Sequence, residues 1–356
     1  MATVKQNQTR KNIFSKNFRK EVLNFLTKKN YSKLFILVDD NTSKLCLPAC
    51  LNVFESFNEH VVIEIPSGEQ HKNLDTAKQV WKELTETNAD RNAVLINLGG
   101  GVVCDLGGFA AGTYKRGINF IHIPTTLLAQ VDAAYGGKQG IDFLNYKNQV
   151  GIFQNPAATF VNTEFLKTLP LEETVNGFAE VIKHGLLSGG EFWKRVTAIK
   201  KLQDVDWKKI VSDSIEIKLS VTEKDPNEKG LRKILNFGHT IGHAVESALI
   251  STGIRTLHGY CVAAGMIGEL YLSLKVCGFP PKKMNKVVSF IRSHFPPIDL
   301  AGIASENLQQ LMLHDKKNSY GRIQFSLLKN IGEPVINVEV KDEEISNAIK
   351  FLNKGL

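Results

Sequence analysis

Asn236-Phe-Gly-His239-Thr-Ile-Gly-His243 is the stretch that decides how the second half of this chain is expected to fold. Beyond it, apolar residues recur every three to four positions up to Leu249, and Gly253 follows. This spacing is typical of an amphipathic helix that ends at a glycine. His239 and His243 stand four positions apart, so both imidazoles lie on one face of that helix, about one turn from each other. The stretch therefore predicts a helix that presents two histidines to one small volume.

A third histidine follows in Leu257-His258-Gly259, where the sequence predicts a second helix from His258 to about Val276. Two histidines at this spacing are often ordinary surface or hydrogen-bonded core residues, but metal sites favour the same spacing. A divalent metal held by imidazoles usually takes a carboxylate as well, and Glu180 is the candidate. Thr240 stands where an H-E-x-x-H metalloprotease has its glutamate, so that class of enzyme is excluded.

The composition is that of an ordinary globular protein. The chain has 356 residues, of which 43% are hydrophobic and 22% charged, which is enough for two domains with separate cores. Its net charge of +8 comes from lysines and arginines spread along the sequence, without an arginine-rich or aromatic-interleaved run. This pattern fits an anionic small-molecule substrate, and we expect no nucleic-acid partner.

The cysteines indicate a reducing compartment. They number five, at positions 46, 50, 104, 261 and 277, and no C-x-x-C pair occurs, so neither a disulfide framework nor a zinc ribbon is indicated. Residues 1–12 are polar and basic, and no uninterrupted apolar run reaches the length of about 18 residues that spans a membrane. We expect a cytoplasmic protein without a membrane partner.

The first half of the chain alternates short apolar runs with periodic segments such as Asp75 to Thr87. The runs are Leu34 to Val38, Val61 to Ile65, Ala93 to Leu98, Phe120 to Ile123 and Thr159 to Val161. Buried parallel strands have this pattern. From about Leu169 helix follows helix, and strands are expected again only at Ile323 to Leu328 and Val335 to Val340. We predict an α/β domain over residues 1–169 and a mainly α-helical domain over residues 170–356.

Ligands of parallel sheets bind beyond the carboxyl ends of the strands, so the residues after each run are candidates. Asp39 and Asn41 follow the first run, and Glu69 and Lys72 follow the second, although either pair is also a plausible turn. The third run is followed by Gly99-Gly100-Gly101-Val102. Glycines between a strand and a helix let the backbone approach a phosphate and aim its amides at negative charge. We interpret this stretch, which is not G-x-G-x-x-G, as a pyrophosphate-binding turn.

The fourth run ends at Pro124-Thr125-Thr126, whose hydroxyls can cap the helix that follows. Asp132 lies inside that apolar segment, where a carboxylate is costly unless it is paired. Lys138 and Lys147 are close enough in sequence to pair it or to bind an anion. In the second half, Glu180, Lys183 and His184 share one helix face, which by itself is more often an exposed ion-pair face.

Further motifs join these in unbroken order between about residues 34 and 332. They are Tyr114-Lys-Arg116-Gly, Gly136-Gly-Lys138, Lys147-Asn148, Phe178-Ala-Glu180-Val-Ile-Lys183-His-Gly and Gly230-Leu-Arg232. Together with the glycine turn, the segment from Pro124 to Asp132 and the histidine motifs, they resemble the 3-dehydroquinate synthases, a family of sugar phosphate cyclases.

The resemblance implies a Rossmann-like NAD-binding α/β domain followed by a mainly α-helical domain that binds metal and substrate. It implies a lyase of the shikimate pathway, and so of chorismate and aromatic amino acid biosynthesis. The substrate is 3-deoxy-D-arabino-heptulosonate 7-phosphate (DAHP), and the products are 3-dehydroquinate and phosphate. The implied reaction runs through transient oxidation by NAD, phosphate elimination, re-reduction and intramolecular aldol closure, with zinc or cobalt as the metal. A homodimer is also implied, in which the arginine matching Arg116 reaches the neighbouring subunit's site.

The resemblance also assigns residues to roles. The metal ligands are matched by Glu180, His239 and His258. The NAD contacts are matched by Asp39, Asn41, Glu69, Lys72, Gly100, Gly101, Val102, Asp105, Thr125, Thr126, Leu128, Lys138, Lys147, Phe165 and Thr168. The substrate and catalytic positions are matched by Arg116, Asp132, Lys138, Lys147, Asn148, Lys183, Lys218, Arg232, Asn236 and His243, joined by one of Lys316 and Lys317. We expect Arg232, with Lys218, to bind the substrate carboxylate, and Lys138, Asn148 and Arg116 to bind its phosphate.

Two stretches depart from the family pattern. Asp132-Ala-Ala-Tyr135-Gly-Gly-Lys138-Gln139 stands where the family commonly has Asp-Ser-Ser-Val-Gly-Gly-Lys-Thr, and His258-Gly-Tyr260 stands where it commonly has His-Gly-Glu. These changes concern the support of His258 and the shape of the phosphate pocket. The alternatives are a cyclase of another sugar phosphate, such as a 2-deoxy-scyllo-inosose or 2-epi-5-epi-valiolone synthase, a metal-dependent polyol dehydrogenase, and a non-catalytic NAD-binding protein. An acid substrate is favoured because Lys218, Arg232 and Asn236 are present.

Overall fold

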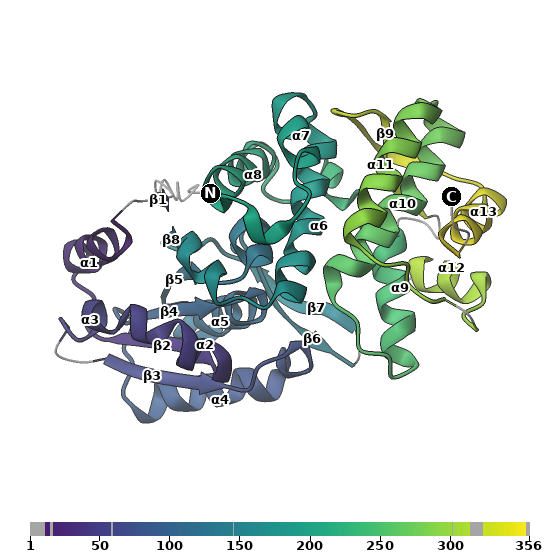
Figure 1. Ribbon diagram of the computed structural model, residues 1–356. Coiled ribbons are helices and arrows are strands. Elements are labelled where there is room, and N and C mark those ends of the chain that lie inside the picture. Colours follow the sequence, from purple (N-terminus) through teal and green to yellow (C-terminus); the bar gives the residue numbers. More distant parts are fainter. Residues whose placement is uncertain are drawn as a thin grey trace, which may run out of the picture. The chain divides into compact units, whose positions relative to one another are not determined.

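The computed structural model describes residues 11–14, 17–57, 60–144, 146–300, 302–313 and 323–353 (Figure 1). The chain forms two compact units, Met1–Leu169 (unit 1) and Pro170–Leu356 (unit 2). Unit 1 is an α/β unit and unit 2 is mainly helical, which confirms the predicted fold class.

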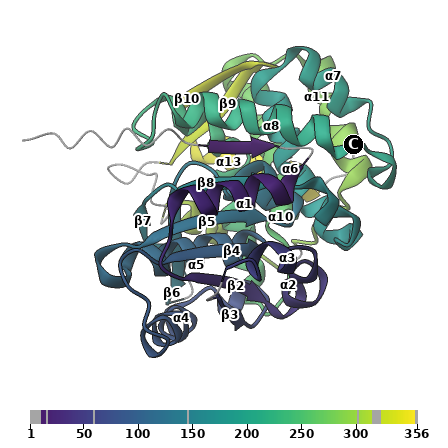
Figure 2. The same cartoon turned by 90° about the vertical axis from the view of Figure 1, so that its left-hand side faces the viewer.

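Unit 1 is built on a parallel sheet. In the described part of the chain it has six strands in the order β1-β8-β5-β4-β2-β3, and Figure 2 shows β8, β5, β4 and β2 following one another. The strands are β1 (Lys11–Phe14), β2 (Leu34–Asp39), β3 (His60–Ile65), β4 (Val94–Gly99), β5 (Asn119–Pro124) and β8 (Ala158–Val161). The five predicted strands are correct to within one residue at each end, whereas β1 was not predicted.

Helices cover both faces of this sheet. Ile36 and Val38 of β2 pack with α1 (Phe18–Lys29) and α3 (Leu51–Phe54), while Leu37 packs on the other face with α4 (Leu74–Glu86) and α5 (Gly101–Thr113). Because both faces are buried, the strands are apolar at nearly every position. For this reason they could be predicted from continuous apolar runs in the sequence. Short segments complete the unit: α2 (Asp40–Leu45), η1 (Leu47–Ala49), η2 (Glu69–His71), η3 (Tyr114–Arg116), η4 (Ala129–Ala133) and η5 (Thr163–Lys167).

The strand order places a switch point between β2 and β4. From β2 the chain moves outward to β3 on one side, and then from β4 to β5 and β8 on the other. Loops that leave such a pair of strands diverge, and the crevice between them is where ligands of open parallel sheets bind. Asp39 ends β2 and Gly99 ends β4, so both residues lie at this switch point.

An antiparallel hairpin lies outside the main sheet and was not predicted. It pairs β6 (Lys138–Phe143) with β7 (Tyr146–Phe153). Two glycines let its strands approach: a Cβ on Gly140 would lie 2.8 Å from the carbonyl oxygen of Val150, and a Cβ on Gly151 would lie 2.4 Å from that of Gln139. The glycine-rich stretch before Lys138 therefore leads into a strand.

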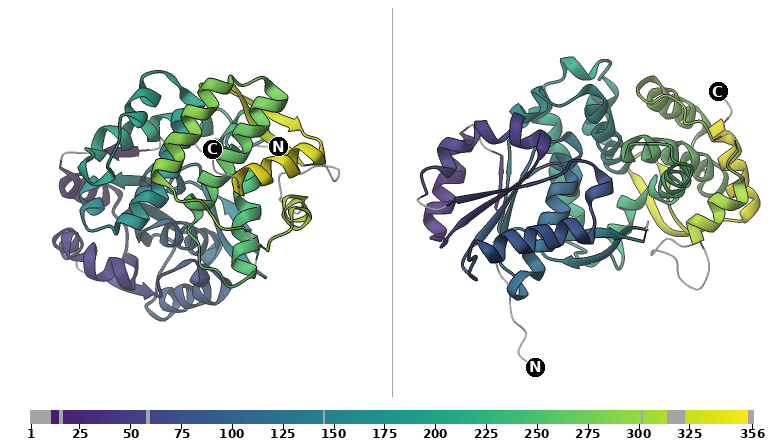
Figure 3. Two further views of the ribbon diagram at one scale, coloured as in Figure 1. Left: turned by 45° about the vertical axis from the view of Figure 1, so that its right-hand side comes forward. Right: turned by 90° about the horizontal axis from the view of Figure 1, so that it is seen from below.

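Unit 2 is organised around α10 (His258–Cys277), which packs against helices on several sides and against a two-stranded hairpin (Figure 3). The helices are α6 (Leu171–Ser188), α7 (Gly190–Thr197), α8 (Trp207–Thr222), α9 (His239–Ser251), α11 (Pro281–His294), α12 (Ser305–Leu313) and α13 (Asp342–Asn353), with the short η6 (Leu202–Asp204) and η7 (Leu231–Asn236). The hairpin pairs β9 (Gln324–Asn330) with β10 (Glu333–Glu339) in antiparallel fashion, where strands were predicted.

Helix α10 is long and apolar enough to cross a membrane by length and composition alone, and among the described residues it is the one helix of this kind. Core helices of globular proteins pass the same test, and 61% of its most apolar window is buried inside the protein. Glu269 lies in its middle and is fully buried, with hydrogen bonds to another helix. We therefore interpret α10 as the central core helix of unit 2.

Candidate functional site

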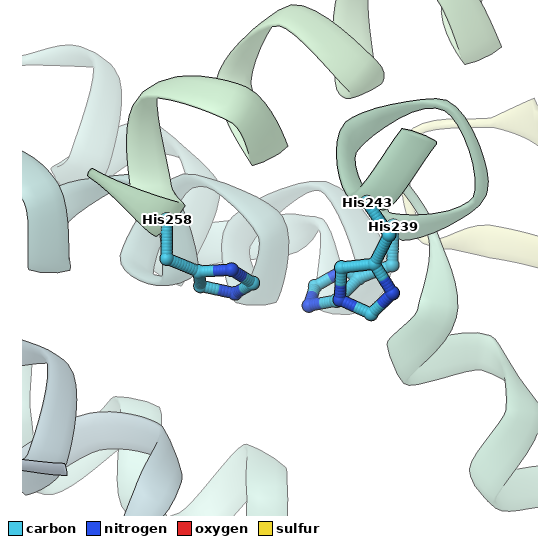
Figure 4. A group of neighbouring side chains, drawn as sticks. All are labelled: His239, His243 and His258. Atoms are coloured by element: carbon cyan, nitrogen blue, oxygen red, sulfur yellow. The ribbon is translucent and has the colours of Figure 1, made fainter. Parts of the chain in front are cut away.

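Three histidines converge in unit 2 (Figure 4). His239 begins α9, His243 follows one turn later, and His258 begins α10. The ring centroid of His239 is 5.1 Å from that of His243 and 5.5 Å from that of His258, and the remaining pair is 5.7 Å apart. One ring nitrogen from each residue lies within 4.8 Å of the other two. His243 was expected to contact the substrate, but it lies as close to His239 and His258 as these two expected metal ligands lie to each other.

Glu180 of α6 reaches the same cluster. Its side chain is buried, and Oε1 lies 3.5 Å from Nε2 of His239. Lys183, one turn along α6, contacts the other oxygen, yet neither carboxylate oxygen accepts a hydrogen bond of good geometry within the described residues. A buried carboxylate beside imidazole nitrogens is a donor set that suits a divalent cation such as zinc. The residues present therefore fit the expected metal.

Two contacts fix the start of α10, and with it His258, relative to α6. The backbone amide of Gly259 donates to Oδ1 of Asn176 at 2.6 Å. A Cβ on Gly259 would lie 1.9 Å from the carbonyl oxygen of Asn176, so a side chain there would force the helices apart. Asn176 stands one turn before Glu180 on α6. The position of His258 is therefore tied to the helix that carries the carboxylate.

The start of α9 is held by Glu269 of α10. Its carboxylate accepts from the amides of Gly238 at 2.6 Å, Thr240 at 3.0 Å and Ile241 at 3.2 Å. These amides belong to the first turn of a helix, where donors lack partners within the helix and the dipole favours negative charge. Gly238 has φ +83, a conformation that glycine adopts readily. These three hydrogen bonds fix the first turn of α9 and thereby the position of His239.

The predicted carboxylate-binding residues are buried in unit 2. Lys218 is 7% exposed on α8, and Arg232 is 3% exposed in η7, which packs against α8. The guanidinium of Arg232 donates to the carbonyl oxygen of Pro226 at 2.7 Å, and Asn236 Nδ2 donates to Glu228 Oε1 at 2.9 Å. The structure thus places these cationic and amide groups on adjacent elements. Lys316 and Lys317 lie outside the described residues.

In unit 1 the glycine turn lies where a phosphate-binding turn is expected. Gly100 caps α5, whose first residues are Gly101 and Val102. A Cβ on Gly100 would lie 3.0 Å from Cγ2 of Thr126, so this threonine stands directly against the turn. Thr126 Oγ1 accepts from the amide of Ala129 at 3.2 Å and so caps the segment that contains Leu128. Thr125 donates its amide to Gly99 O at 2.9 Å, joining the two strand ends.

Asp39 has a structural role at the start of α2. Its Oδ1 accepts from the amides of Asn41 at 3.1 Å and Thr42 at 2.7 Å, and Thr42 Oγ1 accepts from the Asp39 amide at 2.9 Å. This is a capping box at the start of α2. The cap holds Asp39 and Asn41 at the carboxyl end of β2, beside the switch point.

A charged network brings predicted NAD and substrate residues together in unit 1. Lys72 Nζ lies 2.7 Å from Asp105 Oδ2 and 2.7 Å from Asn148 Oδ1. Glu69 lies 3.8 Å from Lys72 and 3.4 Å from Lys147. Burial opposes the charged form of Lys72, but the carboxylates of Asp105 and Glu69 outweigh it and raise the pKa of Lys72. Lys72 therefore stays a cation that holds the Asn148 amide.

The other predicted residues of unit 1 belong to other elements. Arg116 is exposed at the far end of α5 from the glycine turn, about 20 Å away for a helix of 13 residues. Asp132 is half-buried in the π-helical turn η4, and Lys138 is exposed at the start of β6. Phe165 is a core residue, with its ring 5.9 Å from that of Phe18. Thr168 Oγ1 donates to the carbonyl oxygen of Phe165 at 3.2 Å.

Three residues that depart from the family pattern have different surroundings. Gln139 is buried, with Nε2 3.3 Å from Nε2 of His122. Tyr135 is buried beside Cys104, and burial raises the pKa of its hydroxyl. The ring of Tyr260 packs edge-on against Phe295 at 5.5 Å. Within the described residues, the hydroxyl of Tyr135 and Oε1 of Gln139 are buried without a hydrogen-bond partner.

Solved structures share this fold. A 2-deoxy-scyllo-inosose synthase complexed with carbaglucose-6-phosphate, NAD+ and Co2+ superposes with a TM-score of 0.83 at 23% identity, covering 96% of this chain and 95% of that one. A 2-epi-5-epi-valiolone synthase from Streptomyces hygroscopicus with NAD+ and Zn2+ bound has a TM-score of 0.82 at 24% identity, with 90% of each chain covered. At these identities the likeness establishes the fold.

Sequence comparison establishes the family. The models for the N-terminal and C-terminal parts of 3-dehydroquinate synthase match residues 62–176 and 177–318. The 3-dehydroquinate synthase of Parabacteroides distasonis is 43% identical over 349 residues, which is 96% of this chain and 98% of that protein. That of Acetivibrio thermocellus is 41% identical over 319 residues, 88% of each. Because the family models cover residues 62–318 and the relatives match along nearly the whole length, the chain belongs to the 3-dehydroquinate synthase family.

Proposed function

We propose that this chain catalyses the reaction of its family, the conversion of DAHP to 3-dehydroquinate and phosphate in the shikimate pathway. It is then a carbon–oxygen lyase acting on a phosphate. One observation carries the proposal: Glu180, His239, His243 and His258 meet in the same unit that buries Lys218 and Arg232. A cation site and cationic side chains suit a substrate that bears both hydroxyls and anionic groups.

NAD and a divalent metal, zinc or cobalt, are the proposed cofactors. Both fold neighbours named above contain NAD+ together with Co2+ or Zn2+. Unit 1 is the proposed NAD-binding domain, with the pyrophosphate at the amides of Gly101 and Val102. Unit 2 is the proposed metal- and substrate-binding domain, with Glu180, His239 and His258 as the metal ligands.

The metal, when bound, supplies a Lewis acid that stabilises negative charge on a substrate oxygen. The side chains of the protein do the rest. Arg232 presents a planar fork to the substrate carboxylate, with Lys218 adding charge. Lys138 and Asn148 bind the phosphate, and Lys72 holds the Asn148 amide through the 2.7 Å contact. His243 moves a proton on the phosphate side, and its ring stands beside those of His239 and His258.

A homodimer is part of the proposal. Arg116 is exposed and stands at the end of α5 remote from the glycine turn of its own unit. This placement supports a role in the phosphate site of a neighbouring subunit. A cytoplasmic location is supported by the cysteines, since all five lie in the described residues and all are free thiols.

Phosphate release from DAHP tests the proposal. We expect release that needs both NAD and the metal, and no net NADH, because the hydride returns to the substrate in each turnover. The protein is assayed after removal of metal with a chelator, and again after cobalt is restored. A sugar phosphate without a carboxylate serves as the matched substrate and should react far more slowly. Net accumulation of NADH, or release unaffected by the chelator, would contradict the proposed reaction.

A further inference from the structure

Glu246 is a buried carboxylate to which the sequence assigned no role. It lies on α9 seven residues after His239 and three after His243, so it shares their face of the helix. Its side chain is 2% exposed, and its helix neighbour Val245 is fully buried. Burying a carboxylate in apolar surroundings is costly unless it accepts hydrogen bonds. Its presence there calls for a reason.

The carboxylate of Glu246 contacts a residue of the neighbouring helix α10. Oε2 of Glu246 is 3.1 Å from Nδ1 of His258, the residue that begins α10. An ionised carboxylate only accepts, so the imidazole Nδ1 carries the proton and donates. His258 is then held in the tautomer whose lone pair is on Nε2. Its ring also points towards His239 and His243 (Figure 4).

The contact is not needed merely to join α9 to α10. Glu269 already clamps the first turn of α9 with three hydrogen bonds to backbone amides. Glycines bring the two backbones together as well, since a Cβ on Gly265 would lie 1.9 Å from the carbonyl oxygen of Gly238. Against this rigid background, the bond from Glu246 determines the ring orientation and the tautomer of one side chain.

We infer that Glu246 is a positioning residue for the metal centre: it holds His258 in the tautomer whose Nε2 lone pair can bind the cation. The inference rests on the proposed function, in which His258 is a metal ligand. Carboxylates in this position orient a ligating histidine and make it more basic, and their loss typically weakens metal binding by 10- to 100-fold.

Cobalt titration of the metal-free, full-length protein tests the inference. Binding is followed by the visible absorption of the Co2+ complex and by competition with a coloured chelator. We expect Glu246→Gln and Glu246→Ala to weaken Co2+ binding by 10- to 100-fold. The matched control is Val288→Ala, which removes fully buried volume from α11 in the same unit without touching the cluster. It should lower thermal stability and leave Co2+ affinity within about threefold, because it changes packing alone.

A second readout follows the tautomer itself. In protein labelled with ¹⁵N-histidine, the ring signals of His258 are assigned by their loss in His258→Ala. The metal-free wild type should show a proton on Nδ1, and Glu246→Gln should shift the population towards a proton on Nε2. A structural role alone would not move this equilibrium.

The outcomes separate the two proposals. If His258→Ala loses Co2+ while both folded Glu246 variants bind it as tightly as the wild type, the role of Glu246 is wrong and the ligand assignment stands. If His258→Ala binds Co2+ normally, His258 is not a ligand and the proposed metal centre itself is wrong. Should Glu246→Ala fail to fold, Glu246→Gln decides, since it preserves the volume of the side chain.

Discussion

At the scale of single residues, His122 shows how burial determines the protonation state of a side chain. It lies on β5, fully buried, with Nδ1 3.2 Å from the amide of Asn97 and Nε2 3.3 Å from that of Gln139. Burial lowers the pKa of His122 to about 3. The imidazole is therefore neutral in the fold. Both neighbouring amides present their NH₂ groups to the ring, so the ring nitrogen without a proton accepts from the amide beside it.

This lowered pKa predicts a pH dependence of stability. His122 takes up a proton near pH 6.5 in the unfolded chain but not in the folded chain. The contribution of neutral His122 to the free energy of unfolding is therefore fully present above that pH. It is lost as the pH falls towards 3. Between pH 6.5 and 4.5 the loss from this one group is on the order of 2 kcal/mol. Denaturant unfolding of metal-free wild type and His122→Gln at both pH values measures it. The variant should lose that much less stability over the interval; equal losses would mean that His122 is protonated in the fold.

The sequence predicted that His239 and His243 share one helix face and marked His258 as their companion, but it did not predict that Glu246 and Glu269 contact these segments. His239 and His243 are visible because their spacing is internal to one helix. The partners of Glu246 and Glu269 are on another helix, and no spacing within either helix encodes that pairing. A signal existed nonetheless: each glutamate stands in an apolar helical segment, and the argument that singled out Asp132 as costly unless paired applies to both.

At the scale of elements, the clamp between α9 and α10 makes a direct prediction. Glu269→Gln replaces an acceptor by an amide whose NH₂ group would face the amide of Gly238, a donor now bound at 2.6 Å. Buried donors left without acceptors cost about 1–3 kcal/mol each. We expect metal-free Glu269→Gln to be less stable than wild type by about 2 kcal/mol in denaturant unfolding. Its Co2+ affinity should also fall, because His239 begins the released turn.

Glu216→Gln is the matched control, since this exposed glutamate lies on α8 of the same unit. A change there should stay within about 0.5 kcal/mol. Wild-type stability in Glu269→Gln would show that the three amides find other acceptors and that the clamp does not position α9.

Elements were predictable where their periodicity is strong. The two histidine-bearing helices begin and end close to the predicted residues, because caps and apolar spacing are local. β1 has only four residues and follows a basic stretch, so no run marks it. β6 and β7 carry Gly140 and Gly151 at their closest approach, and glycine gives a strand no side-chain pattern. Such strands are specified by pairing with one another, which becomes visible only in three dimensions.

At the scale of the whole molecule, two different hydrophobic patterns in the sequence correspond to the two units. Period-free apolar runs build the sheet of unit 1, whose carboxyl edge collects loops and helix starts that suit a dinucleotide. Helical periodicity builds unit 2, where side chains from α6, α9 and α10 meet in one volume. Family membership assigns the reaction, while the placement of donors assigns each proposed cofactor to its own unit.

Hydrogen exchange of the full-length protein tests this division. Cobalt added to the metal-free protein should slow amide exchange in the first turns of α9 and α10, since ligand binding stabilises the elements that carry the ligands. NAD added alone should slow exchange at residues 100–105 and 69–72 of unit 1. His239→Ala is the matched control, and it should lose the cobalt effect while keeping the NAD effect, because its side chain belongs to the metal cluster alone. Cobalt protection confined to residues below 170, or NAD protection confined to residues above it, would reverse the assignment and overturn the proposed roles of the two units.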